Sequence, residues 1–147
     1  MKIIVFASKK GGVSKTTSAL FTAQYLSKNS KTLLIDLDSQ NALTDFFFDE
    51  YQDITILEAI KGQVPFKECI KKVSENLSVI PNKLAFEEVN NWNITGKEFL
   101  LKDELALIEN EFDYVVIDTP PSLNIETVLG LVCADIVVIP ARLEKMD

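Results

Sequence analysis

The sequence predicts an α/β fold with a doubly wound, mainly parallel β-sheet. Short, continuous apolar runs rich in β-branched residues alternate with stretches in which apolar residues recur at helical spacing. Strands of a parallel sheet are buried on both faces because the crossover helices cover both sides, so their sequences are continuously apolar rather than alternating. The chain has 147 residues, which suits one domain spanning residues 1–147.

The expected elements follow one another in alternating order. Five strands are predicted at residues 3–7, 32–35, 77–80, 114–117 and 136–139. Helices are predicted at residues 15–28 and 125–133, as two short pieces within residues 54–73, and on a face formed by Leu101, Leu105, Ile108 and Phe112. Ligands of open α/β sheets bind at the carboxyl ends of the strands. Three polar segments fall there: the loop after the first strand, residues 36–40 and residues 118–122.

The composition excludes several kinds of chemistry. The sequence has no histidine, which rules out histidine metal ligands and histidine-based triads, and Cys69 and Cys133 are too far apart for a local zinc or redox motif. We expect both cysteines to be reduced and buried. No apolar run reaches the length of a membrane span or a signal peptide, so we expect a cytoplasmic protein without membrane binding.

The charge is unevenly distributed along the chain. The net charge is −7, and residues 98–147 hold eleven acidic side chains against three basic ones. Such a surface repels phosphate backbones, so we expect this chain by itself to bind DNA poorly.

The loop after the first strand has the parts of a phosphate-binding loop. Gly11 and Gly12 allow the backbone to curl so that its N–H groups face an anion, and Lys15 can reach the outer phosphates of a nucleotide. Thr16 offers a hydroxyl to Mg²⁺ at a helix N-terminus. The strict pattern G-x-x-x-x-G-K-[ST] is not met, because Lys9 and Ser14 stand where it requires glycine. The predicted nucleotide-binding residues are Lys10, Gly11, Gly12, Val13, Ser14, Lys15, Thr16 and Thr17.

Two carboxylates follow the second strand and one follows the fourth. Asp36 and Asp38, one residue apart, can hold hydrated Mg²⁺ and orient a water molecule toward a γ-phosphate. Asp118 ends an apolar strand and is suited to holding Mg²⁺ through water. Taken singly, each could be a simple strand terminator; together they predict a site for a Mg²⁺-bound nucleotide with Thr16, Asp36, Asp38 and Asp118 as its metal-binding residues.

These segments resemble the ParA/MinD family of P-loop ATPases. The loop is similar to the family's deviant Walker A motif K-G-G-x-x-K-[ST], with Lys10 at its signature lysine. Residues 36–40 look like the D-x-D-P-Q switch with Ser39 in place of proline, and residues 113–123 look like the Walker B strand and its I-D-T-P-P-S loop. The resemblance implies Lys10, Lys15 and Asp38 as catalytic residues, with Asp36 more structural. Ser14 stands where glycine is commoner, and it would cost on the order of 1 kcal/mol if that position needs a positive φ.

The resemblance also implies a biological role. Family members closest to this pattern are partition ATPases, which form homodimers on ATP and Mg²⁺, work with a ParB-like partner protein and segregate plasmid or chromosomal DNA. Lys10 would then contact the nucleotide of the partner subunit. The family ordinarily continues beyond the position of Asp147 with further strands, adenine contacts and the residues that bind DNA non-specifically. We therefore expect the chain to be the N-terminal portion of the family fold, with an apolar surface exposed on residues 136–139.

Three other interpretations stay open. The chain could be a degenerate, non-enzymatic module that binds a full-length ATPase, a possibility motivated by Ser14, Ser39 and the absent C-terminal part. It could be a MinD-like cell-division ATPase, or, less in keeping with Lys10, a metabolic P-loop kinase. The aromatic run Phe46–Phe48 with Tyr51 is expected to lie mainly in the core, and Trp92 is assigned no role.

Overall fold

The computed structural model contains a six-stranded sheet with the order β3-β4-β2-β5-β1-β6. Its description covers the chain except residues 51, 84–90, 92, 94 and 142–147, so Tyr51 and Trp92 lie outside it. The strands are β1 (Lys2–Phe6), β2 (Thr32–Asp36), β3 (Lys71–Lys72), β4 (Leu77–Ile80), β5 (Tyr114–Asp118) and β6 (Ile136–Val138). All neighbours pair in parallel except β3 with β4. The predicted doubly wound, mainly parallel sheet is confirmed.

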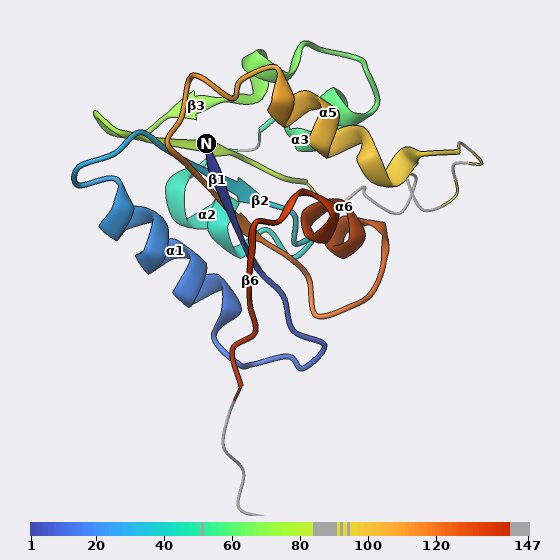
Figure 1. Cartoon of the computed structure of the whole chain (residues 1–147), viewed down its shortest axis with the longest axis horizontal. Coiled ribbons are helices and arrows are strands. Elements are labelled where there is room, and N and C mark those ends of the chain that lie inside the picture. Colours follow the sequence, from blue (N-terminus) through green and yellow to red (C-terminus); the bar gives the residue numbers. More distant parts are fainter. Residues whose placement is uncertain (51, 84–90, 92, 94, 142–147) are drawn as a thin grey trace, which may run out of the picture.

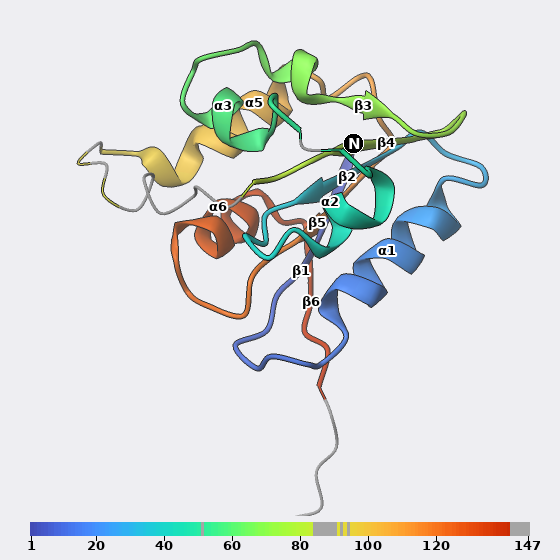
Figure 2. The ribbon, with the colours of Figure 1, turned by 180° about the vertical axis from the view of Figure 1, so that it is seen from behind.

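Helices cover both faces of this sheet (Figure 1). The helical segments are α1 (Lys15–Leu26), α2 (Ala42–Phe47), α3 (Ile56–Ile60), the 3-10 turns η1 (Phe66–Cys69) and η2 (Lys97–Phe99), α5 (Leu100–Ala106) and α6 (Ile125–Cys133). One core cluster joins α3, α5 and α6 to the sheet, and the other joins α1 and α2 to its opposite face. The view from behind shows α1 and α2 on their side of the sheet (Figure 2).

The alternation of side chains along each strand explains the two cores. In β2, Leu33 and Ile35 belong to the cluster under α3, α5 and α6, whereas Leu34 belongs to the cluster under α1. All five residues of β2 are buried, since it lies between β4 and β5 with helices on both faces. This confirms the reading of continuous apolar runs as central strands.

Several elements differ from the prediction, among them the strand β3, which was not predicted. The helix α2 was not predicted. The helix predicted to extend to Phe112 is shorter than expected, because α5 ends at Ala106 and tighter turns follow it, with Leu107 N–H donating to Glu104 O. The second short helix within residues 54–73 is a 3-10 turn.

The aromatic run is divided between core and surface. Phe47 and Phe48 pack against the cluster under α1, but Phe46 is 59% exposed. The expectation of core is therefore wrong for Phe46, because successive residues of α2 point in different directions. Both cysteines are buried and free, as predicted.

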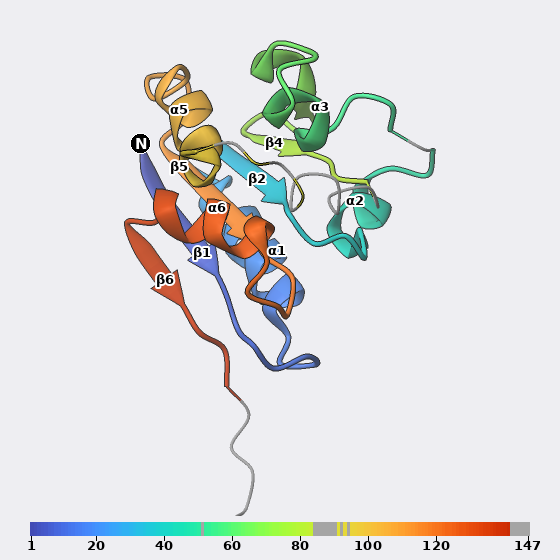
Figure 3. The same cartoon turned by 90° about the vertical axis from the view of Figure 1, so that its right-hand side faces the viewer.

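The strand β6 lies at one edge of the sheet (Figure 3). Ile136 is 45% exposed and Val137 is 44% exposed, and Ile139 just beyond the strand is 69% exposed. The predicted apolar surface at residues 136–139 is therefore present.

Candidate functional site

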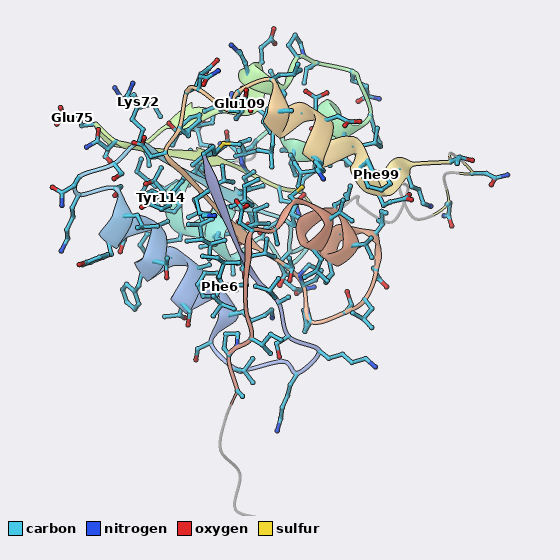
Figure 4. The ribbon with its side chains drawn as sticks, viewed as in Figure 1. Phe6, Lys72, Glu75, Phe99, Glu109 and Tyr114 are labelled. Atoms are coloured by element: carbon cyan, nitrogen blue, oxygen red, sulfur yellow. The ribbon has the colours of Figure 1, made fainter. Side chains whose placement is uncertain are left out.

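The register of the sheet brings the three polar segments to one end. Asp36 of β2 lies opposite Asp118 of β5, and Phe6 of β1 lies on the other side of Asp118. The loop that follows Phe6 therefore starts beside Asp118, and Asp36 lies one strand further away. Tyr114 and Phe6 mark the opposite ends of the paired strands β5 and β1 in Figure 4.

Among the described residues, the other end of the sheet shows no glycine loop faced by strand-end carboxylates. A cavity of about 390 Å³ near Lys72 and Glu75 opens at the amino ends of the strands, on Tyr114's side in Figure 4. Its position is opposite to the carboxyl ends at which open α/β sheets bind their ligands.

Two residues of the loop have left-handed backbone conformations. Gly12 has φ 71° and Ser14 has φ 63°. A side chain in this region costs about 1 to 2 kcal/mol relative to glycine's free choice of φ. The condition under which Ser14 was expected to be strained is thus met. No atom lies within 4 Å of a Cβ built on Gly11 or Gly12, so their surroundings leave the loop open to a ligand.

The helix α1 begins directly at Lys15 and places it in the interior of the site. Lys15 is only 7% exposed, whereas Lys10 on the loop is exposed. The helix N-terminus adds unpaired N–H groups and a partial positive charge beside Lys15. This arrangement can bind an anionic group.

Thr16 and Asp118 join the loop to the strand. The Thr16 hydroxyl donates to Asp118 Oδ2 at 2.7 Å. Asp118 is fully buried, and its Oδ1 accepts no hydrogen bond from the described residues. A buried carboxylate oxygen without a donor costs free energy unless a cation or a donor satisfies it.

Asp36 is held by three hydrogen bonds. Its Oδ1 accepts from Asp38 N–H at 3.0 Å, and its Oδ2 accepts from Thr44 N–H at 2.9 Å and from the Thr44 hydroxyl at 2.7 Å. The Thr44 hydroxyl in turn accepts from Asn82 N–H at 2.9 Å. Asp36 thereby links the end of β2 to Thr44 of α2 and, through Thr44, to Asn82 just after β4.

Asp38 follows Asp36 by two residues and is also shielded from solvent. It is 8% exposed, and its Oδ1 accepts from Gln40 N–H at 3.0 Å. No hydrogen bond from a described residue to the other oxygen, Asp38 Oδ2, is found.

Burial raises the pKa of both strand-end carboxyls. For Asp118, desolvation raises the pKa to about 7, which the Thr16 hydrogen bond and the charge of Lys15 only partly oppose. For Asp36, desolvation raises the pKa to about 6 despite the bonds from Thr44 and Asp38. Repulsion among the three aspartates adds to both shifts. A bound cation would relieve this repulsion.

The donor set fits Mg²⁺ better than a metal held by the protein alone. No group of three His, Cys, Asp or Glu side chains gathers around a common point in the described part of the chain. Mg²⁺ is usually bound through one or two carboxylates, water molecules and substrate phosphates. The orphaned Asp118 Oδ1 and the neighbouring Thr16 hydroxyl match that requirement.

Thr44 and Asn82 were missed by the sequence reasoning. Thr44 lies eight residues after Asp36, and Asn82 another 38 residues on. Neither spacing follows a helix or strand period, so only the unpredicted α2 could have indicated Thr44. Thr119, whose hydroxyl donates to Phe6 O at 2.8 Å, was likewise not singled out.

A glycine-bearing loop between a parallel strand and a helix, faced by strand-end carboxylates, defines the class of P-loop nucleotide-binding proteins. Residues 1–147 match the family described as the AAA domain, and the chain belongs to that family, in its ParA-like branch. The predicted resemblance is therefore confirmed at the level of the family.

Three known proteins illustrate the relationship. The chromosome partitioning protein ParA of Myxococcus xanthus (strain DK1622) is 36% identical over 149 residues, covering 97% of this chain and 53% of the relative. A plasmid partition protein from Borrelia burgdorferi B31, solved with AMPPNP, is 41% identical with a TM-score of 0.88, covering 95% of this chain and 62% of that one. Cobyrinic acid a,c-diamide synthase from Mycobacterium smegmatis, solved with an ATP analogue and magnesium, is 29% identical with a TM-score of 0.90, covering 96% and 60%.

The chain thus spans little more than half the length of its ParA relative. None of the helices in the described residues has the length and apolar character that a membrane span requires.

Proposed function

We propose that residues 1–147 form the nucleotide-binding part of a ParA-like partition ATPase. The observation that carries this proposal is the pairing of Thr16, at the start of α1, with a buried Asp118 whose second oxygen has no donor among the described residues. Mg-ATP would supply what the site lacks, which is a cation near this oxygen and phosphate groups for the loop. The ligands named for the Borrelia and Mycobacterium structures are consistent with such an occupant.

Each predicted residue has a role in this proposal. The backbone N–H groups of residues 10–17, which include Val13, Ser14 and Thr17, surround the phosphates, and Lys15 neutralises the outer ones. Thr16 and Asp118 hold Mg²⁺, which would offset the charge that develops on the phosphate oxygens.

The two aspartates after β2 divide their work. Asp38 orients the attacking water through its carboxylate. Asp36, also predicted as a metal-binding residue, acts on the metal only indirectly in this proposal, since hydrogen bonds from Asp38 and Thr44 occupy both of its oxygens.

A role for the complete protein forms the second part of this proposal. We propose that ATP drives formation of a homodimer in which Lys10 contacts the partner's nucleotide. A ParB-like partner would stimulate hydrolysis, and a further segment would bind DNA non-specifically during plasmid or chromosome segregation in the cytoplasm. The partition proteins among the relatives support this assignment.

A second function is favoured by Ser14. Its φ of 63° places a serine where the backbone prefers glycine. A strained loop of this kind suits a degenerate module that binds a full-length ATPase without hydrolysing ATP. The two functions differ in whether the chain hydrolyses ATP.

The experiment is a titration of the purified chain with a fluorescent ATP analogue and Mg²⁺. Binding should saturate, disappear in Lys15→Ala and persist in the control Lys102→Ala, which removes an exposed lysine of α5. Light scattering in the same samples reports whether a dimer forms with ATP. Equal binding by the two lysine variants, or none by the parent chain, would contradict the proposal.

Turnover separates the two functions. Phosphate release that Asp38→Ala abolishes supports the ATPase. Saturable binding without release, in a chain that associates with a full-length relative, supports the non-enzymatic module.

A further inference from the structure

Thr44 attaches the start of α2 to the end of β2, and Figure 3 shows α2 beside the ends of β2 and β4. The Thr44 N–H is one of the donors that the first turn of a helix leaves without a partner inside the helix, and the Asn41 side chain does not cap this helix. Asp36 Oδ2 accepts from the Thr44 N–H at 2.9 Å and from the Thr44 hydroxyl at 2.7 Å. Asp36 therefore takes the place of the missing cap.

The direction of the Thr44 hydroxyl is fixed from its other side. Asn82 N–H donates to the hydroxyl oxygen at 2.9 Å, so the hydroxyl proton is directed to Asp36. Thr44, Asn82 and Asp36 are all buried, so bulk water does not compete for these bonds. A hydroxyl that is bonded on both sides in this way holds the carboxylate of Asp36 in one orientation.

The fixed carboxylate in turn holds the backbone of Asp38. Asp36 Oδ1 accepts from Asp38 N–H at 3.0 Å, and Asp38 O accepts from Asn41 N–H at 2.8 Å just before α2 begins. The backbone of Asp38 is thus bonded on both sides to groups whose positions depend on where α2 is attached. Within the described residues no hydrogen bond joins Thr44 to Asp38 directly, so the effect of Thr44 on Asp38 passes through Asp36.

We propose that Thr44 is a positioning residue for ATP hydrolysis. It fixes Asp36, and Asp36 sets the position from which the Asp38 carboxylate orients the attacking water. This inference rests on the proposed function and adds to it a residue that acts only through another side chain. A misplacement on the order of 1 Å in a group that orients reactants can lower a rate about 100-fold, so loss of one of the two bonds from Thr44 should be visible in kcat.

The test is the rate of phosphate release by the purified chain over a range of Mg-ATP concentrations, at a temperature at which circular dichroism shows every variant to be folded. Thr44→Val keeps the shape of the side chain and the bond from the backbone N–H but removes the hydroxyl. We expect kcat to fall about ten-fold and KM to change less than about two-fold, because the orientation of the water is lost and not the binding of the nucleotide. Thr44→Ser restores the hydroxyl and should recover kcat to within about three-fold of the parent.

Thr55→Val is the matched control. The Thr55 hydroxyl likewise donates to a carboxylate, that of Glu58, at 2.7 Å and accepts a backbone N–H, that of Leu57, at 3.3 Å. Thr55 is also buried and lies at the start of a short helix, but no hydrogen bond in the described part of the chain joins it to Asp36. Its kcat should equal that of the parent. An equal fall of kcat in Thr55→Val and Thr44→Val would trace the loss to general destabilisation and overturn the proposal.

The outcomes separate this inference from the proposed function. Phosphate release that Asp38→Ala abolishes, but that Thr44→Val leaves at the kcat of the parent, overturns the role of Thr44 alone. No release by the parent, or release that survives Asp38→Ala, overturns the proposed function and this inference with it. If Thr44→Val does not fold, Thr44→Ala takes its place with the same expected fall of kcat. It also lacks the hydroxyl, and its smaller side chain leaves room for a water molecule that accepts from Asn82 N–H.

Discussion

Thr16 and Asp118, which lie 102 residues apart in the sequence, are joined by a 2.7 Å hydrogen bond between the start of α1 and the end of β5. Only one oxygen of the buried carboxylate takes part. Without a ligand, the negative charge of Asp118 is therefore only partly compensated. The stability of the folded chain should depend on pH and on cations for this reason.

Stability of the ligand-free chain should fall as the pH rises from about 4 to about 7. Burial raises the pKa of Asp118 to about 7 and that of Asp36 to about 6 from ordinary values near 4. A raised pKa in the folded state stabilises it below the unfolded pKa, and that stability is lost as the pH passes the folded pKa. Urea unfolding at pH 5 and pH 8 measures the difference.

Asp118→Asn should remove most of this pH dependence. The amide oxygen can still accept from Thr16, but the buried charge is gone. At pH 8 we expect the variant to be more stable than the parent by on the order of 1–3 kcal/mol. It should also lose Mg²⁺-dependent nucleotide binding. The exposed control Asp103→Asn should show neither effect, and an Asp118→Asn chain less stable than the parent at pH 8 would refute the explanation.

Ser14→Gly should stabilise the fold. Removal of a side chain from a left-handed residue gains about 1–2 kcal/mol, of which the greater freedom of glycine in the unfolded chain takes back about half. We expect a net gain of about 0.5–1 kcal/mol in urea unfolding. The matched change Ser18→Gly inside α1 should instead destabilise by about 1 kcal/mol. The same sign in both variants would show that the backbone of Ser14 is unstrained.

Thr44→Val should destabilise the protein through Asp36. The change keeps the shape of the side chain but removes the donor to Asp36 and the acceptor for Asn82 N–H. Asn82 N–H is then left buried without an acceptor and Asp36 Oδ2 keeps only the bond from Thr44 N–H, which should cost about 2–3 kcal/mol. Thermal and urea unfolding measure this loss. Thr17→Val, on the exposed side of α1, should change stability by less than about 0.5 kcal/mol.

Ile139→Lys should reduce self-association of the isolated chain. Ile139 is exposed next to the edge strand β6, so the charge costs little stability and interrupts an apolar surface. Light scattering over a concentration series should show less association than in the parent. Leu107→Lys removes an equally exposed apolar residue at the end of α5. An equal effect of both changes would indicate general solubility rather than the β6 edge.

Most of the fold could be predicted because the main strands are continuous apolar runs. The limits of β2, β4 and β5 agree with their apolar runs to within a residue. The strand β3 was missed because Lys71 and Lys72 carry no apolar pattern. The helix α2 was missed because it is short and its first turn has no side-chain cap.

The sequence by itself determined the order of the elements and the presence of the glycine loop and aspartates at the strand ends, because periodicity and local spacing are properties of neighbouring residues. The tertiary structure alone decided that Ser14 is left-handed, that Asp118 keeps an unpaired oxygen and that Asn82 keeps an unpaired amide. Those properties depend on which distant segments pack together and exclude water, and no local pattern records them.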